Sequence, residues 1–92
     1  MILRATRGHF DPARFDEVNA AIPAVLALVR ALPGLRGERT GVNRGAGTSI
    51  IFTLFDTLEQ AQFSRDVLGE PFARIQAAGW RPEAPEFYEV TE

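Results

Sequence analysis

One histidine and a group of aromatic side chains are the residues of this sequence that could do chemistry. His9 follows Gly8 and is the single histidine among the 92 residues. Its side chain is the one whose unperturbed pKa lies nearest neutrality, so it could act as a general base toward a phenolic substrate at the rim of a sheet. The alternative is a surface histidine that is hydrogen-bonded to a nearby carboxylate such as Asp11.

The aromatic side chains could line an apolar cavity. The candidates are Phe55, Phe63, Phe72, Trp80 and Tyr88. Small-molecule pockets are lined mainly by apolar and aromatic groups with a few polar ones, and the tyrosine hydroxyl could orient a substrate oxygen. These rings could equally fill the core or a dimer interface, where aromatic residues supply much of the buried area.

Two other patterns have simple structural interpretations. The run Asn-Arg-Gly-Ala-Gly at 43–47 could present backbone N–H groups to an anion, but no helix follows it, and it is also typical of a hairpin turn. Glutamates recur at every third position from 83 to 92, a spacing that alternates between the two faces of a strand and makes no carboxylate pair. No phosphate-binding loop, serine-histidine-acid order or cluster of metal ligands appears.

The composition argues against several classes of protein. The chain has 10 basic residues and 12 acidic ones, which disfavours a nucleic-acid binder with a broad basic surface. It has no cysteine for a disulfide scaffold or a thiol nucleophile. The most apolar window, 20–35, contains charge and proline and is shorter than the roughly 20 apolar residues that span a bilayer. With no visible signal peptide, we expect a cytoplasmic protein that uses no cofactor or metal and binds no membrane.

Hydrophobic periodicity predicts the elements of the first half of the chain. Residues 1–10 alternate between two faces and predict a first strand that ends near Gly8 and His9. One face of this strand holds Ile2, Arg4 and Thr6. Asp11 and Pro12 are typical of a helix start, and an apolar stripe continues the helix to Leu32. Pro23 lies within that stripe, which predicts a kinked helix or two abutting segments.

The second half of the chain predicts strands and helices in an order that defines the fold. A weak strand at 36–43 and a strong one at 48–55 precede a helix over 58–68. A short further helix ends near Gly79, and an extended arm leads to a last strand at 87–91. The order β-α-β-β-α-β predicts an α+β, ferredoxin-like sheet in one domain, 1–92, with helices on one face.

The other face of such a sheet needs a partner. Within the strand at 48–55, one face is wholly apolar and consists of Ile50, Phe52 and Leu54. We expect the opposite, mixed face, which carries Ile51 and Phe55, to be the face that the helices leave uncovered. Phe87 or Tyr88 of the last strand would add to it. Pairing two sheets face to face would bury this patch, which predicts a two-fold symmetric homodimer.

Three framework motifs carry a resemblance over nearly the whole chain. They are the strand that ends in Arg7 before Asp11-Pro12, the segment Leu-Pro-Gly-Leu at 32–35, and the segment Leu-Phe-Asp-Thr-Leu-Glu-Gln-Ala at 54–61. With these motifs the chain resembles the dimeric α/β-barrel superfamily, and within it the antibiotic-biosynthesis-monooxygenase-like domains. The resemblance implies a homodimer with a ligand cavity between sheet and helices in each protomer.

The resemblance supplies no catalytic residue. The haem-degrading branch of the family has an asparagine, a tryptophan and a histidine where this chain has Thr6, Phe55 and Arg65, so haem degradation is disfavoured. The resemblance, taken together with the single histidine, predicts cofactor-independent oxidation of a small aromatic, quinol-like molecule with His9 as the base. The expected substrate-binding residues are Thr6, Phe55, Phe63, Trp80 and Tyr88. A non-catalytic small-molecule-binding or assembly protein of the same fold is the alternative, and the sequence leaves open whether the chain is an enzyme.

Overall fold

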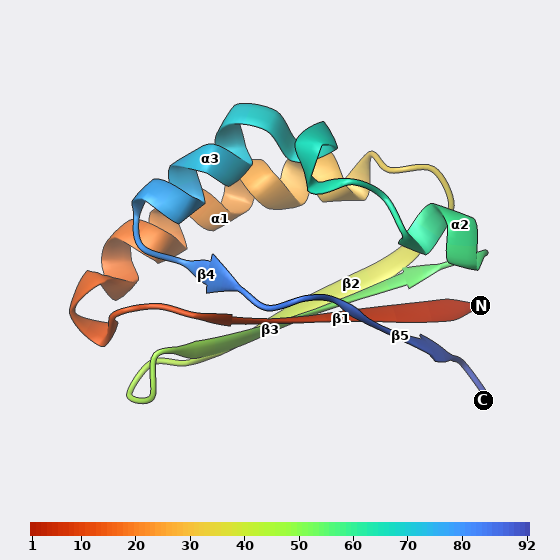
Figure 1. Cartoon of the computed structure of the whole chain (residues 1–92), viewed down its shortest axis with the longest axis horizontal. Coiled ribbons are helices and arrows are strands. Elements are labelled where there is room, and N and C mark those ends of the chain that lie inside the picture. Colours follow the sequence, from red (N-terminus) through yellow and green to blue (C-terminus); the bar gives the residue numbers. More distant parts are fainter.

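Five antiparallel strands form one sheet, and the helices cover one of its faces (Figure 1). The computed structural model describes residues 1–92. The strands are β1 (Ile2–His9), β2 (Leu35–Asn43), β3 (Thr48–Phe55), β4 (Arg81–Pro82) and β5 (Glu86–Glu89). Their order is β2-β3-β1, and both β4 and β5 pair with the free edge of β1. This is the predicted ferredoxin-like arrangement.

The helical layer has two main helices and several short pieces. The helices are α1 (Phe15–Arg30), α2 (Leu58–Ala61) and α3 (Gly69–Ala77), and the 3₁₀ turns are η1 (Pro12–Arg14) and η2 (Arg65–Leu68). Helices α1 and α3 lie side by side over the sheet, whereas α2 lies at one end, near both chain termini (Figure 1). None of the helices combines the length and the apolar character needed to cross a membrane.

The first helix begins with a 3₁₀ turn and is not divided at its proline. The Asp11 side chain accepts a hydrogen bond from the Ala13 amide at 2.9 Å and caps η1. Helix α1 then runs without interruption through Pro23, so the alternative of two abutting segments is wrong. Proline removes one amide donor, and the carbonyl that loses this partner belongs to Asn19, an exposed residue where water can replace the donor.

The single helix predicted over 58–68 is wrong. Thr57 caps α2 by accepting from the Gln60 amide at 3.2 Å, but α2 ends at Ala61. Ser64 then caps η2 by accepting from the Asp66 amide at 3.2 Å. A serine side chain that bonds to the backbone in this way competes with continued helix, which divides the segment. The short further helix is confirmed as α3, and the last strand is β5, shifted by a residue or two from its predicted span.

The structure reverses the expected faces of the central strand. In β3 the mixed face turns toward the helices: Phe55 is fully buried, and Ile51 lies opposite Thr6 of β1. The apolar residues Ile50, Phe52 and Leu54 lie on the uncovered face and are partly exposed. The mixed face can be turned inward because its polar groups have partners there: Ser49 accepts from the Trp80 indole, and Thr53 bonds to a backbone carbonyl.

The core lies between α1, α3 and the helix-facing side of the sheet. Its buried members are Phe10, Val18, Ala21, Val25, Val29, Leu68, Ile75, Ala78 and Trp80. Trp80 packs edge-on against Phe72, with ring centroids 6.0 Å apart. Gly8 of β1 lies under the indole, and a Cβ at this position would collide with the indole ring. The glycine is therefore what allows the tryptophan to lie against the strand.

Candidate functional site

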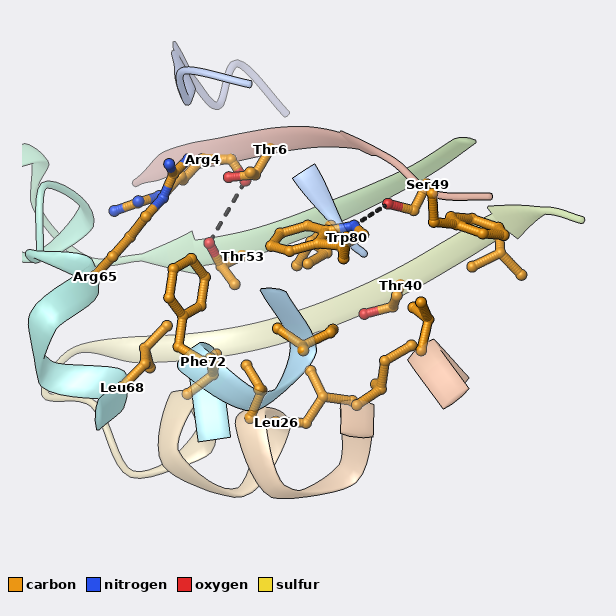
Figure 2. Close-up of a pocket in the computed structure, with 18 of the residues that line it drawn as sticks. Arg4, Thr6, Leu26, Thr40, Ser49, Thr53, Arg65, Leu68, Phe72 and Trp80 are labelled. Atoms are coloured by element: carbon orange, nitrogen blue, oxygen red, sulfur yellow. Dashed lines mark hydrogen bonds between the residues drawn. The ribbon is translucent and has the colours of Figure 1, made fainter. Parts of the chain in front are cut away.

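A pocket lies between the helix-facing side of the sheet and the helices (Figure 2). Its volume is about 60 Å³, and 13 of its 19 lining residues are hydrophobic. An engineered cavity that binds benzene measures about 150 Å³, so an aromatic ring would enter this pocket only by displacing side chains of its wall. Leu26 and Phe72 are among the partly exposed residues of this wall.

Few polar groups line the pocket, and most of them are already hydrogen-bonded. The Trp80 indole N–H donates to Ser49 Oγ at 3.0 Å. The Thr53 hydroxyl donates to the Arg4 carbonyl oxygen at 3.5 Å. The Thr40 hydroxyl, on β2, is buried in the wall and has no hydrogen-bond partner. Because a buried polar atom without a partner is costly, Thr40 is a point where a bound molecule could add a hydrogen bond.

Arg4 brings a positive charge into this apolar environment. Its residue is only 5 % exposed. Nη1 donates to the carbonyl oxygens of Ala61 at 2.8 Å and Phe63 at 3.0 Å, which ties the segment after α2 to β1. The guanidinium carbon lies 3.9 Å from the centroid of the Phe63 ring, in cation–π geometry. Arg4 takes part in none of the six ion pairs of the structure.

Arg65 lies at the same end of the pocket as Arg4 (Figure 2). Its Nη2 donates to the backbone carbonyl of Glu83 at 2.7 Å, and it also forms no ion pair. Burial, together with the nearby Arg65 guanidinium, lowers the pKa of Arg4 to about 10. Arg4 therefore stays protonated at neutral pH, and two cationic groups face the pocket without a carboxylate beside them.

Three of the predicted substrate-binding residues line the pocket. They are Thr6, Phe63 and Trp80. Phe72, also named among the aromatic candidates, lines it as well. Phe55 does not reach it: the residue is completely buried behind Phe63, with ring centroids 5.8 Å apart. Phe55 thus supports a wall of the pocket without touching the space inside.

His9 and Tyr88 lie on the opposite face of the sheet. Side chains alternate along β1, so His9 points away from the face that carries Arg4 and Thr6. Its Nε2 is 2.8 Å from a carboxylate oxygen of Glu83, and the side chain is 58 % exposed. Of the two interpretations of His9, the carboxylate-paired surface histidine matches this geometry, with Glu83 in place of the expected Asp11.

Tyr88 faces solvent and donates its phenol hydrogen to a Glu86 carboxylate oxygen at 2.6 Å. This hydrogen bond to Glu86 raises the pKa of the phenol above its usual value. Glu86 also pairs with Arg7, at 3.2 Å, on the same uncovered face. The predicted role of Tyr88 as a pocket residue therefore does not fit this protomer, because β5 pairs it with Leu3 on the face away from the helices.

The glycine-rich run at 43–47 forms the β2–β3 turn. The Asn43 side chain accepts from the Ala46 amide at 3.1 Å, and the Asn43 carbonyl accepts from the Gly47 amide at 3.0 Å. Arg44 packs over the ring of Phe15, 4.1 Å from its centroid. Two backbone N–H groups of the run thus donate to Asn43 and not to a bound anion, which confirms the hairpin interpretation. No group of three or more potential ligand side chains is placed to hold a metal ion.

Comparisons with known proteins give the fold a name. No family model and no curated protein matches the sequence. Among solved structures, a protein from Deinococcus radiodurans, provisionally named an antibiotic biosynthesis monooxygenase, matches with a TM-score of 0.77 at 10 % identity, over 100 % of this chain and 94 % of that one. A protein of the same provisional name from Caulobacter crescentus matches with a TM-score of 0.74 at 14 % identity, over 99 % and 91 %.

SnoaB, a cofactor-independent oxygenase from Streptomyces nogalater, matches with a TM-score of 0.63 at 16 % identity, over 99 % of this chain and 93 % of that one. The predicted resemblance is thus confirmed for the fold: the chain has the ferredoxin-like fold of the antibiotic biosynthesis monooxygenase structures along its full length. Sequence identities as low as these show that the fold is shared and do not show a shared function.

Proposed function

We propose that this protein binds a small, largely apolar aromatic molecule in the pocket between its sheet and its helices. The observation that carries the proposal is the composition of the pocket wall, which is mainly aliphatic and aromatic with a few polar groups at defined points. That combination is typical of small-molecule sites. Trp80 and Phe72 offer the ring faces and edges against which an aromatic molecule would pack.

The lining favours a binding role over catalysis by a side-chain base. None of the lining residues is a histidine, an aspartate, a glutamate or a tyrosine. A general base must come within about 2.6–3.2 Å of the proton that it removes. His9 lies on the other face of the sheet and does not meet this condition in the protomer.

Cofactor-independent oxidation of a quinol-like molecule is the second candidate, and the shared fold with SnoaB favours it. In such a reaction the quinol loses two protons and two electrons to O2, which gives the quinone and hydrogen peroxide. Arg4 and Arg65 would stabilise the substrate anion, which in this scheme enters the pocket already deprotonated.

Fluorescence of Trp80, the single tryptophan of the chain, tests the binding proposal. We expect hydroquinone to quench it saturably in the wild-type protein. Val25→Phe adds a ring to the pocket wall and should abolish quenching, whereas Leu28→Phe, on the exposed side of α1, should not. Circular dichroism checks that both variants fold, since overpacking costs about 1–3 kcal/mol. Equal quenching in all three proteins, or none in the wild type, would contradict the proposal.

Replacement of His9 tests the histidine as a general base. Because its side chain lies on the uncovered face, we expect His9→Ala to leave hydroquinone binding unchanged. We expect the same for any oxygen uptake that the wild-type protein supports with this compound, measured with an oxygen electrode. A loss of uptake of about a hundredfold, the size typical of a general base, with binding retained would restore His9 as the catalytic base.

The uncovered face of the sheet supports the predicted homodimer. Its apolar centre is formed by Leu3, Ile50, Phe52, Leu54 and the ring of Tyr88. Arg7, paired with Glu86, lies on the same face beside this centre. We propose that a second copy covers this face, sheet against sheet, since a contiguous apolar patch on a soluble protein marks an interaction site. A cytoplasmic location remains a prediction.

A further inference from the structure

The pocket contains a positive charge for which the chain supplies no negative partner. Arg4 is almost fully buried, remains protonated at neutral pH and is adjacent to a second guanidinium, Arg65. Burial of a charge is costly unless it is paired or fully hydrogen-bonded, and a like charge nearby adds to this cost. No aspartate or glutamate lines the pocket.

The contacts that Arg4 does make account for only part of its hydrogen-bonding capacity. A guanidinium has five N–H donors. Nη1 uses its two on the carbonyls of Ala61 and Phe63, and the Phe63 ring covers one face of the group. Nε and Nη2 have no acceptor anywhere in the chain. Nη1 of the guanidinium is therefore held by the backbone, and the N–H groups of Nε and Nη2 are free to donate to an acceptor on a ligand.

We propose that the natural ligand of this pocket is an aromatic carboxylate, with its acid group held by Arg4 and Arg65 and its ring against Trp80. This inference rests on the proposed binding function and names the class of molecule. A planar guanidinium matches a carboxylate in geometry as well as charge, and charge-assisted bonds of this kind are about twice as strong as neutral ones. The rest of the wall is mainly apolar and carries no charge, so it would accept the ring and reject a second charge.

The unpartnered Thr40 hydroxyl suggests a second polar group on the ligand. Thr40 lies on β2, opposite Ile51, which in turn lies opposite Thr6 of β1. Strands β1, β2 and β3 form the floor of the pocket, with Arg4 on β1 and Thr40 on β2, on either side of β3. Figure 2 shows Arg4 and Thr40 toward opposite ends of the pocket. We therefore infer a ligand whose ring carries a hydroxyl away from its carboxylate. Because even one ring enters this pocket only by displacing side chains of the wall, the ligand should have a single ring.

Two probes that differ in charge and little in shape test the inference: 4-hydroxybenzoate and 4-hydroxybenzamide. Binding of each is measured by calorimetry at pH 7, where only the acid is ionised. We expect the wild-type protein to prefer the acid by about tenfold or more, the gain associated with hydrogen bonds to a charged group. Arg4→Met and Arg65→Met should each lose most of this preference. Arg74→Met, on the exposed surface of α3, should retain it.

The outcomes separate this inference from the binding function on which it rests. Arg4→Met also removes donors to two backbone carbonyls, so if it fails to fold, Arg65→Met decides the test. Equal affinity of the wild type for acid and amide would overturn the carboxylate inference and leave the pocket as a binding site for neutral rings. Binding of neither probe would overturn both. Thr40→Val should weaken both probes by a similar factor, and an unchanged affinity would remove Thr40 from the site.

Discussion

Replacement of Trp80 with alanine is expected to lower the free energy of unfolding by about 3–5 kcal/mol, the cost typical of deleting a buried tryptophan side chain. The side chain is 4 % exposed, packs edge-on against Phe72, and closes the core against Gly8 of β1. Its removal also leaves Ser49 without its indole donor. Because small domains are stable by only about 5–15 kcal/mol in total, this single change should bring the chain close to unfolding at room temperature.

Urea denaturation followed by circular dichroism measures this effect, since the variant has no tryptophan fluorescence. Trp80→Phe should retain most of the ring packing but lose the hydrogen bond to Ser49. Its free energy of unfolding should therefore lie between those of the wild type and Trp80→Ala. Leu58→Ala, at an exposed apolar position, serves as the control and should change stability by less than about 0.5 kcal/mol. All proteins are compared at one concentration because dimerisation contributes to apparent stability. A loss below about 1 kcal/mol in Trp80→Ala would mean that the side chain does not organise the core.

Phe52→Arg is expected to convert a dimer into a monomer. Phe52 lies at the centre of the uncovered face, on β3 between β1 and β2, and is paired with Ala5 on one side and Arg39 on the other. Two-fold symmetry would bring a charge at this position close to its own copy in the partner, so the substitution removes apolar contact and adds repulsion twice. The fold should persist, because the position contributes nothing to the core on the helix side.

Light scattering on a sizing column gives the mass that decides this prediction. Val67→Arg places the same charge on an exposed apolar residue of η2, on the other side of the molecule, and should leave the dimer intact. A wild-type protein that elutes as a 10.1 kDa monomer would contradict the proposed sheet-to-sheet interface. A Phe52→Arg variant that remains dimeric would place the interface elsewhere.

The order of the elements could be predicted because the local signals and the tertiary packing agree. Asp11 caps the first turn as predicted, and the alternation in 48–55 is that of a real strand. The faces of this strand could not be predicted because both are rich in apolar residues. Hydrophobicity alone favoured burial of Ile50, Phe52 and Leu54. The deciding contacts, from Trp80 to Ser49 and from Thr53 to the Arg4 carbonyl, join residues distant in sequence.

The candidate site could be predicted in part. Thr6, Phe63 and Trp80 line the pocket, but the two arginines were not predicted as binding residues. A signal for Arg4 was present, since alternation places it on the same strand face as Thr6. A charged residue is ordinarily taken as solvent-exposed, and nothing local indicates that the carbonyls of Ala61 and Phe63 will fold over it. His9 was selected for its chemistry alone, and strand alternation places it on the other face.

The alternation of β3 also limits how the length of this chain can change during evolution. Neighbouring residues of the strand serve different purposes: Ile51 and Thr53 line the pocket, whereas Ile50 and Phe52 lie on the uncovered face. Insertion or deletion of one residue within the strand would exchange these sets and disrupt both surfaces at once. The turn at 44–47 lies outside the ladder and is exposed except for the buried Gly47, so it is where such a change could be absorbed. Relatives that differ in length should therefore differ at this turn and keep an unbroken β3.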